Sequence, residues 1–213
     1  VVTDIILWIR NATEKIKQEL LILYNSILEL AERDGNIIIP AYTHLQRAQP
    51  IVVGGELLAW LEAFFRCEKR IDRLCYLHNS NPLGAGAVAG SGLPIDSNNT
   101  GNALGFREPT RNSIDATSSR DMISDFIYSL SMIAMNLSRW AEQWIIYNTV
   151  EFGYITIDNR YTAGSSMMPQ KKNPDMLELI RGRCSNVYGE LMSIMVLMKG
   201  LPLGYNRDFQ EDK

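Results

Sequence analysis

The chain has 213 residues, of which 46% are hydrophobic, and its formal net charge at pH 7 is −3. This length suits one large domain or two small ones, and the hydrophobic fraction is sufficient for a core. The slightly acidic balance argues against a nucleic-acid-binding surface, and the absence of a run of about eighteen apolar residues argues against a membrane span.

The first third of the chain predicts two long helices separated by a short extended segment. Apolar residues recur at intervals of three and four from residue 3 to about 33, the spacing of one helix face: Ile5, Ile9, Ile16, Leu20, Leu23, Ile27 and Leu30. Gly35 is expected to end this helix, because glycine accepts the left-handed conformation that is common after a helix. Residues 37–40 should be extended, since a residue before proline avoids the α region. His44 then lies in an ordered connection, and a second helix is predicted from about 52 to 78.

The rest of the chain predicts two further long helices. Residues 79–112 are rich in glycine, asparagine and proline, which indicates a long irregular segment with a short helix near Asn102; loops of this length are often functional. A third helix is predicted from about 118 to 150 and a fourth from about 175 to 199. Long antiparallel helices with few strands predict an all-α bundle.

The third predicted helix carries more apolar residues than one bundle face needs: Ile123, Phe126, Ile127, Leu130, Met132, Ile133, Met135, Leu137 and Trp140. Such a helix is expected to be buried on more than one face. Oligomerisation through helices is the simplest explanation of this surplus. In the fourth helix, Met192, Met195 and Met198 have helical spacing and are expected to lie in the core.

Three cysteines, Cys67, Cys75 and Cys184, lack the spacing of a metal site or of a disulfide framework. They are expected to be reduced, mostly buried thiols in a cytoplasmic protein. The glycines between Gly84 and Gly90 do not match GxGxxG and follow no predicted strand. Close backbone packing, or approach to a substrate, is therefore expected there rather than nucleotide binding.

Residues 164–173, with the sequence GSSMMPQKKN, gather two hydroxyls, two lysines and an amide just before a predicted helix start. Helix N-termini and free backbone N–H groups attract anions, so this loop suits a negatively charged substrate. Ser165 would be a poor base unless loop N–H donors, the following helix dipole or Lys171 stabilised its alkoxide. The alternative is a flexible surface linker. Met167 and Met168 disfavour it, because apolar residues suggest that part of the loop packs inward.

The chain contains two histidines, His44 and His78. A lone histidine in a loop is more often a structural hydrogen-bonding residue, although an imidazole can also transfer protons near physiological pH. His78 lies at a predicted helix end and is expected to interact with the helix dipole. Glu178 falls in the first turn of the fourth helix, where a carboxylate also favours the dipole.

Four segments resemble one enzyme family. The loop at 164–174 matches the GSSxMPxKxNP signature of the fumarase/aspartase superfamily of lyases. Residues 40–51, PAYTHLQRAQPI, resemble the PGYTHLQRAQPI segment of argininosuccinate lyases, and residues 113–121 resemble that family's NSMDATSERD. Residues 199–213 resemble its KGLPSTYNKDLQEDK. The segments stand in the family's order, so the resemblance covers essentially the whole chain; delta-crystallins, lens proteins of the same family, share these motifs.

The resemblance implies a fold, a reaction and an assembly. The fold would be the long antiparallel helix bundle of the central fumarase/aspartase domain. The reaction would be the reversible cleavage of argininosuccinate into arginine and fumarate, a step of arginine biosynthesis and of the urea cycle, without a metal or organic cofactor. The assembly would be a homotetramer whose active sites combine segments from three subunits.

The resemblance also assigns roles to individual residues. His44 and Ser165 would transfer protons; Ser165 is favoured as the base and His44 as the acid, and the reverse assignment stays open. Glu178 would be the carboxylate that orients His44. Lys171 and Asn173 would hold the substrate carboxylates. The remaining substrate-binding positions would be Thr43, Tyr205, Gln210 and Lys213.

The sequence departs from the family pattern at Ala41, Ser97 and Ser119. None of these positions is assigned to proton transfer. Ser119 replaces the glutamate of SERD, which puts the salt bridging around Arg120 in doubt.

Family members have an N-terminal domain with a GRSRNDQ segment and more helix after the last segment quoted above. Residue 1 already begins a helical pattern, and the final charged stretch ought to continue. Residues 1–213 are therefore expected to be a fragment, a single central domain that is inactive alone. Two alternatives stay open. One is another lyase of the superfamily, of the adenylosuccinate lyase or fumarase type, and the other is a non-catalytic, crystallin-like structural protein.

Overall fold

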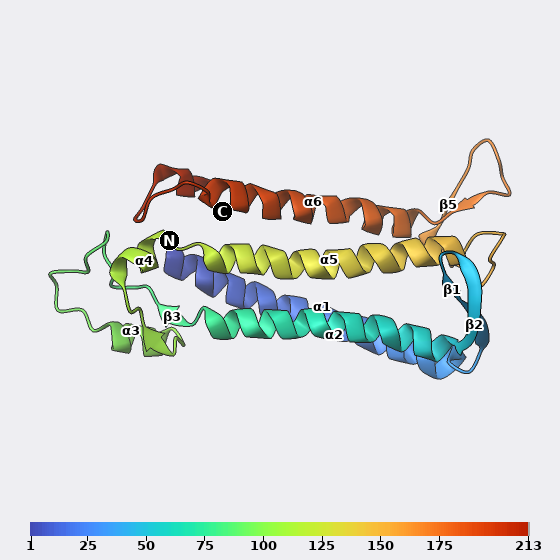
Figure 1. The fold of residues 1–213 in the computed structure, drawn as a ribbon, viewed down its shortest axis with the longest axis horizontal. Helices are drawn as coiled ribbons and strands as arrows, with labels where there is room; N and C mark the ends of the chain where they lie inside the picture. Colours follow the sequence, from blue (N-terminus) through green and yellow to red (C-terminus); the bar gives the residue numbers. More distant parts are fainter. Residues whose placement is uncertain (213) are drawn as a thin grey trace. The chain divides into compact units, whose positions relative to one another are not determined.

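The computed structural model describes residues 1–212 and is dominated by long helices (Figure 1). The four long ones are α1 (Val2–Asp34), α2 (Val53–Leu77), α5 (Asp121–Tyr147) and α6 (Asp175–Met198). Shorter elements are α3 (Ser97–Ala103), α4 (Ser113–Ser118) and the 3₁₀ turns η1 (Asn159–Tyr161) and η2 (Arg207–Glu211). The all-α prediction and the four long helices are confirmed. The unpredicted α4 is too short for apolar periodicity to reveal.

Strands are few, and in the described residues they form two-stranded pairs. β1 (Ile38–Thr43) and β2 (Gln46–Val52) make an antiparallel hairpin. β3 (Ser80–Asn81) pairs in parallel with β4 (Glu108–Pro109), and β5 (Ala163–Gly164) pairs antiparallel with β6 (Lys172–Asn173). The predicted extended segment before His44 is therefore confirmed as the start of β1.

Contacts divide the chain into two compact units, with the divisions falling inside the long helices. Unit 1 contains residues 1–18, 68–130 and the described residues from 189 onward, and unit 2 contains residues 19–67 and 131–188. The prediction of one central domain over residues 1–213 stays a prediction.

In unit 1 all four long helices contribute to one core. Its buried members are Ile6, Ile9, Leu74, Phe106, Met122, Ile123, Phe126 and Ile194. Polar pairs fix the helix direction: Thr13 meets Cys75 at 3.5 Å, and Lys17 Nζ donates to Asp72 at 2.9 Å. The later residue of α1 contacts the earlier residue of α2, so the two helices are antiparallel.

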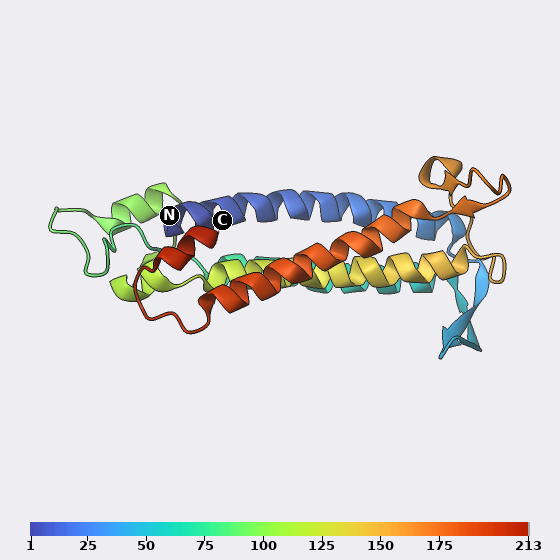
Figure 2. The ribbon, with the colours of Figure 1, turned by 90° about the horizontal axis from the view of Figure 1, so that it is seen from above.

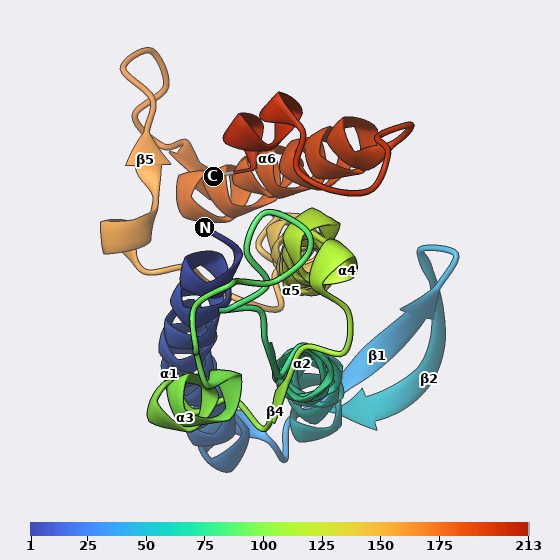
Figure 3. The same cartoon turned by 90° about the vertical axis from the view of Figure 1, so that its left-hand side faces the viewer.

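The irregular segment predicted at 79–112 lies at one end of unit 1, where it carries α3, β3 and β4 (Figure 3). A Cβ atom on Gly86 would lie 2.1 Å from the carbonyl oxygen of Gly90, so the expected close backbone packing is confirmed. His78 Nε2 lies 2.8 Å from an Asp125 carboxylate oxygen of α5. His78 also directly follows the last residue of α2, and its interaction with the dipole of that helix stays a prediction.

In unit 2, α5 packs against both α2 and α6. Asn136 Nδ2 donates to Cys67 Sγ at 3.3 Å on one side, and Cys184 Sγ donates to the carbonyl oxygen of Ala134 at 3.0 Å on the other. The prediction that this helix is buried on more than one face is confirmed. Because α2 and α6 of the same chain cover those faces, the surplus of apolar residues on α5 does not by itself indicate oligomerisation.

Large exposed apolar side chains lie on all four long helices, and those on α1 and α6 include Trp8, Leu21, Ile22, Met176, Leu179, Met192, Met195 and Val196. The prediction that Met192 and Met195 lie in the core is wrong, since they are 65% and 57% exposed. The stripe of α6 that faces the unit 1 core carries Ile194, Leu197 and Met198, so of the three methionines Met198 alone packs against that core, and it is half-buried.

Cys67 and Cys184 are buried, Cys75 is half-buried, and all three are free thiols, as predicted. Within residues 1–212, no helix has the length and hydropathy needed to cross a bilayer.

Candidate functional site

The Ser165 loop is closed at its base by β5 and β6, where Gly164 pairs with Lys172. The half-buried Ser165 Oγ accepts hydrogen bonds from the backbone N–H groups of Met167 at 3.3 Å and Met168 at 3.2 Å. These loop donors are one of the three predicted sources of alkoxide stabilisation. Negative charge on this oxygen would therefore be stabilised by two N–H dipoles that already point at it.

The tip of the loop projects away from the helices (Figure 1). Met167 is 88% exposed and Met168 is 44% exposed, so the prediction that part of the loop packs inward is wrong for this chain. The physical reason is the short β5–β6 ladder, which holds the base of the loop and leaves its tip beyond the helix packing.

The other predicted residues of this region lie between the loop and the first turn of α6. Lys171 and Glu178 are exposed, and Asn173 is half-buried on β6. The neighbouring Lys172 donates from Nζ to Asn159 Oδ1 at 2.6 Å. Ser165, Lys171 and Asn173 therefore share one hairpin whose amide, ammonium and hydroxyl groups suit an anionic ligand.

His44 occupies the turn between β1 and β2. His44 and Leu45 form the two-residue turn, with φ of 55° and 56°. Positive φ matches the twist of a hairpin turn, but it is costly for residues other than glycine, asparagine and aspartate. Thr43 is the last residue of β1, and both Thr43 and His44 are exposed.

A hydrogen bond between the hydroxyls of Tyr42 and Tyr154 anchors this hairpin. The Tyr42 ring also lies 5.1 Å from the Phe152 ring. The hydrogen bond from Tyr154, supported by the Arg47 guanidinium, lowers the pKa of Tyr42. His44 is thus presented from a hairpin that is fixed two residues before it.

A cleft of about 640 Å³ lies in unit 2 and is mostly apolar. Its lining includes Leu57, Trp144 and Met176, and its polar members include the half-buried Glu56 and the buried Tyr147. Glu56 accepts hydrogen bonds from Gln143 Nε2 at 2.8 Å and from the Tyr147 hydroxyl at 3.1 Å. The lining of the cleft contains none of the predicted site residues.

Burial raises the pKa of Glu56. Burial and the nearby Glu56 charge raise the pKa of Tyr147 to about 12, so its hydroxyl stays a neutral donor.

We expect Glu56→Gln to weaken the pH dependence of stability. A carboxyl whose pKa is raised by folding stabilises the folded protein most at a pH below its ordinary pKa. This stabilisation is lost as the pH rises through the pKa of the folded state. The unfolding temperature should differ less between about pH 4 and about pH 7 in the variant than in the parent. Glu62→Gln, at an exposed position of the same helix, should retain the parent's difference. Equal differences in parent and Glu56→Gln would contradict the assignment.

The predicted catalytic residues are not gathered in one place within the chain. Among residues 1–212, no hydrogen bond or ion pair joins His44 to Ser165 or Glu178. The β1–β2 hairpin and the β5 segment project toward different sides (Figure 2). Tyr205 and Gln210 belong to unit 1, and Lys213 lies outside the described residues.

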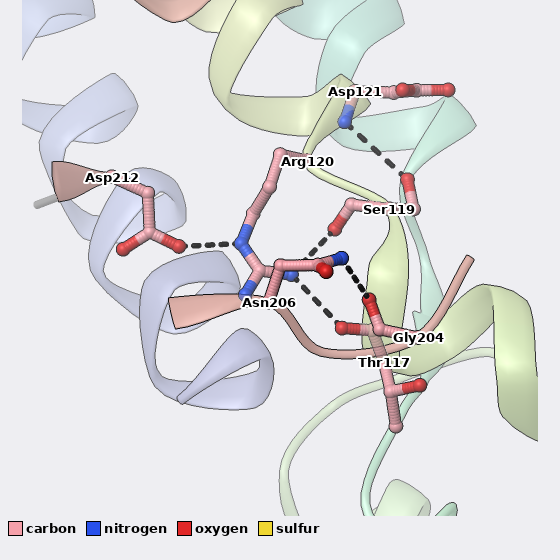
Figure 4. Close-up of polar contacts among 7 residues, drawn as sticks. All are labelled: Thr117, Ser119, Arg120, Asp121, Gly204, Asn206 and Asp212. Atoms are coloured by element: carbon pink, nitrogen blue, oxygen red, sulfur yellow. Dashed lines mark hydrogen bonds and ion pairs between the residues drawn. The ribbon is translucent and has the colours of Figure 1, made fainter. Parts of the chain in front are cut away.

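A contact that the sequence left in doubt is a buried ion pair. Arg120 Nε lies 2.5 Å from Asp212 Oδ2, although Ser119 stands where the family has glutamate (Figure 4). This pair spans 92 residues, and the Tyr42–Tyr154 pair spans 112. Tyr42 and Asp212 lie inside the motif segments, but no spacing rule could indicate their partners.

The model of a family described as lyase matches residues 1–189. The chain belongs to the lyase family.

Curated relatives of this lyase chain include argininosuccinate lyases. It is 48% identical over 213 residues to the chloroplastic enzyme of Arabidopsis thaliana, covering 41% of that protein. It is also 48% identical to the enzyme of Caldanaerobacter subterraneus subsp. tengcongensis, covering 48% of it. In both cases all of this chain is matched, so it spans less than half the length of these relatives.

Solved structures of related proteins have the same fold. An EDDS lyase in complex with formate matches 97% of this chain with a TM-score of 0.92 and 27% identity, and the match covers 42% of that protein. A structure described as fumarate lyase:delta crystallin, from Brucella melitensis and bound to cobalt, matches 99% of this chain and 49% of that protein, with a TM-score of 0.81 and 19% identity. The second likeness concerns the fold alone.

Proposed function

We propose that the protein containing these residues is an argininosuccinate lyase. The observation that carries this proposal is the 48% identity to proteins of that name over all 213 residues. The geometry of the Ser165 loop supports it, because the hydroxyl already accepts two backbone N–H bonds in a loop that also presents Lys171.

The proposed reaction is a β-elimination that breaks a carbon–nitrogen bond. A base removes a proton next to a carboxylate, so negative charge accumulates on a group that is already charged. Lys171 and Asn173 would stabilise that charge and hold the substrate carboxylates. An acid then protonates the departing guanidinium nitrogen. We assign the base to Ser165 and the acid to His44; the reverse assignment is the alternative.

We propose that the active sites form between subunits of a homotetramer. His44 and Ser165 are presented on separate hairpins of unit 2 and are not joined within the chain. The exposed apolar residues of α1 and α6 are candidates for burial between subunits. The substrate-binding positions would be completed by Thr43, Tyr205, Gln210 and Lys213, and Glu178 would orient His44. We also propose a cytoplasmic location, which the free thiols support.

The test is fumarate formation, followed by ultraviolet absorbance, from a panel of substrates. The full-length protein should release fumarate from argininosuccinate, and not from adenylosuccinate or malate. Activity on adenylosuccinate or malate would indicate another lyase of the superfamily, and inactivity on all three would favour a crystallin-like structural protein. Residues 1–213 alone should show no useful rate, because positioning groups outside them would be lost. Comparable rates for the two proteins would contradict this dependence.

A further inference from the structure

The segment after α6 turns back and ends in η2 (Figure 2). Gly200 and Gly204 have φ of 77° and 90°, a conformation that glycine adopts without steric cost. This reversal brings η2 into unit 1 with the start of α5. The segment carries Tyr205 and Gln210, two of the proposed substrate-binding residues.

The 3₁₀ geometry of η2 separates an inward face from an outward face. A 3₁₀ helix has three residues per turn, so residues three apart lie on the same side. Phe209 and Asp212 share the inward side and are 2% and 8% exposed. Gln210 is exposed, and Tyr205 is 58% exposed. Gln210 and Tyr205 are therefore the groups exposed to a substrate. Their placement depends on the contacts that hold Phe209 and Asp212 inside.

The Arg120 guanidinium holds that inward side. Its Nε donates to Asp212 Oδ2 at 2.5 Å, and its centre lies 4.2 Å from the centroid of the Phe209 ring. Nη1 donates to the carbonyl oxygens of Thr117 and Ser119 at 3.2 Å and 2.9 Å (Figure 4). The two charged side chains are 2% and 0% exposed. One side chain thus joins the α4–α5 junction to Phe209 of η2 and to Asp212, the residue that follows η2.

We infer that Arg120 and Asp212 are positioning residues that set the placement of Tyr205 and Gln210 for substrate. This inference rests on the proposed function, since it concerns the substrate contacts of that site. A planar guanidinium with a stacked ring and fixed donors defines orientation as well as distance. A buried pair of this kind constrains the segment more tightly than exposed charges on the same turn would.

The test is a double-mutant cycle in the full-length protein with argininosuccinate as substrate. Asp212→Asn keeps the shape and removes the charge, and Gln210→Ala removes a proposed substrate contact. Each should raise KM by roughly 10-fold or more, because Gln210→Ala deletes a hydrogen bond to a charged substrate and Asp212→Asn weakens the contact that positions that residue. The double variant should have nearly the KM of Gln210→Ala alone, because residues that act through one another are not additive. Asp208→Asn, at an exposed position of η2, should keep the parent KM.

The outcomes separate the two proposals. An unchanged KM for Gln210→Ala would remove the substrate role of that residue and the inference with it. A raised KM for Gln210→Ala with a parent KM for Asp212→Asn, or fully multiplicative effects, would overturn the positioning role alone. If Asp212→Asn does not fold, Phe209→Leu replaces it in the cycle, since it removes the stacked ring and keeps an apolar side chain. A parent KM for Phe209→Leu would then overturn the inference.

Discussion

Replacing Ser165 with alanine in the full-length protein should lower turnover of argininosuccinate by roughly 10²–10⁴-fold, the range expected for loss of a general acid or base. The hydroxyl accepts two loop N–H bonds and is the group that we assign to proton removal. The fold should survive, since the loop projects beyond the helix packing. Steady-state fumarate release and circular dichroism measure the two effects.

Ser166→Ala is the matched control, because Ser166 is the adjacent, exposed hydroxyl of the same loop. It should retain turnover within a few-fold of the parent. Equal losses in the two variants would show that the loop as a whole, rather than the Ser165 hydroxyl, is responsible. Turnover of Ser165→Ala close to the parent value would refute its catalytic role.

His44→Asn should lower turnover to a similar extent, by roughly 10²–10⁴-fold. Asparagine tolerates positive φ better than most residues, so the turn at φ 55° should be kept. The variant therefore removes the imidazole while preserving the hairpin. Turnover and thermal unfolding of the full-length protein measure this.

Leu45→Asn makes the same kind of change at the other turn residue, where φ is 56°. It should retain most of the parent activity. If Leu45→Asn lost as much activity as His44→Asn, the conformation of the turn would be the important feature instead of the imidazole. Glu178→Gln should shift the pH optimum if this carboxylate contacts His44 in the assembled protein. An unchanged profile would remove Glu178 from that role.

The long helices could be predicted from the sequence because helix periodicity is a local property. Ile9 and Ile27 recur on one face of α1 and are 2% and 0% exposed. Gly35 directly follows the last residue of that helix, and Pro40 lies within the extended strand β1 that comes next. The segments that carry Ser165 and His44 could be found from their motifs, because the order of residue types within a loop is also local.

Exposure was decided only by the tertiary structure, because it depends on which element covers a given helix face. Met192 and Met195 have the spacing of core residues and are exposed, whereas the faces of α5 are covered by α2 and α6.

Pairing over long distances in the chain was also decided by the tertiary structure. Arg120 pairs with Asp212, which is 92 residues away in the sequence, and Tyr42 pairs with Tyr154, which is 112 residues away. Such contacts follow from how the helices pack and how the chain reverses at Gly200 and Gly204. No local pattern specifies them, because each partner is satisfied only once distant segments have been brought together.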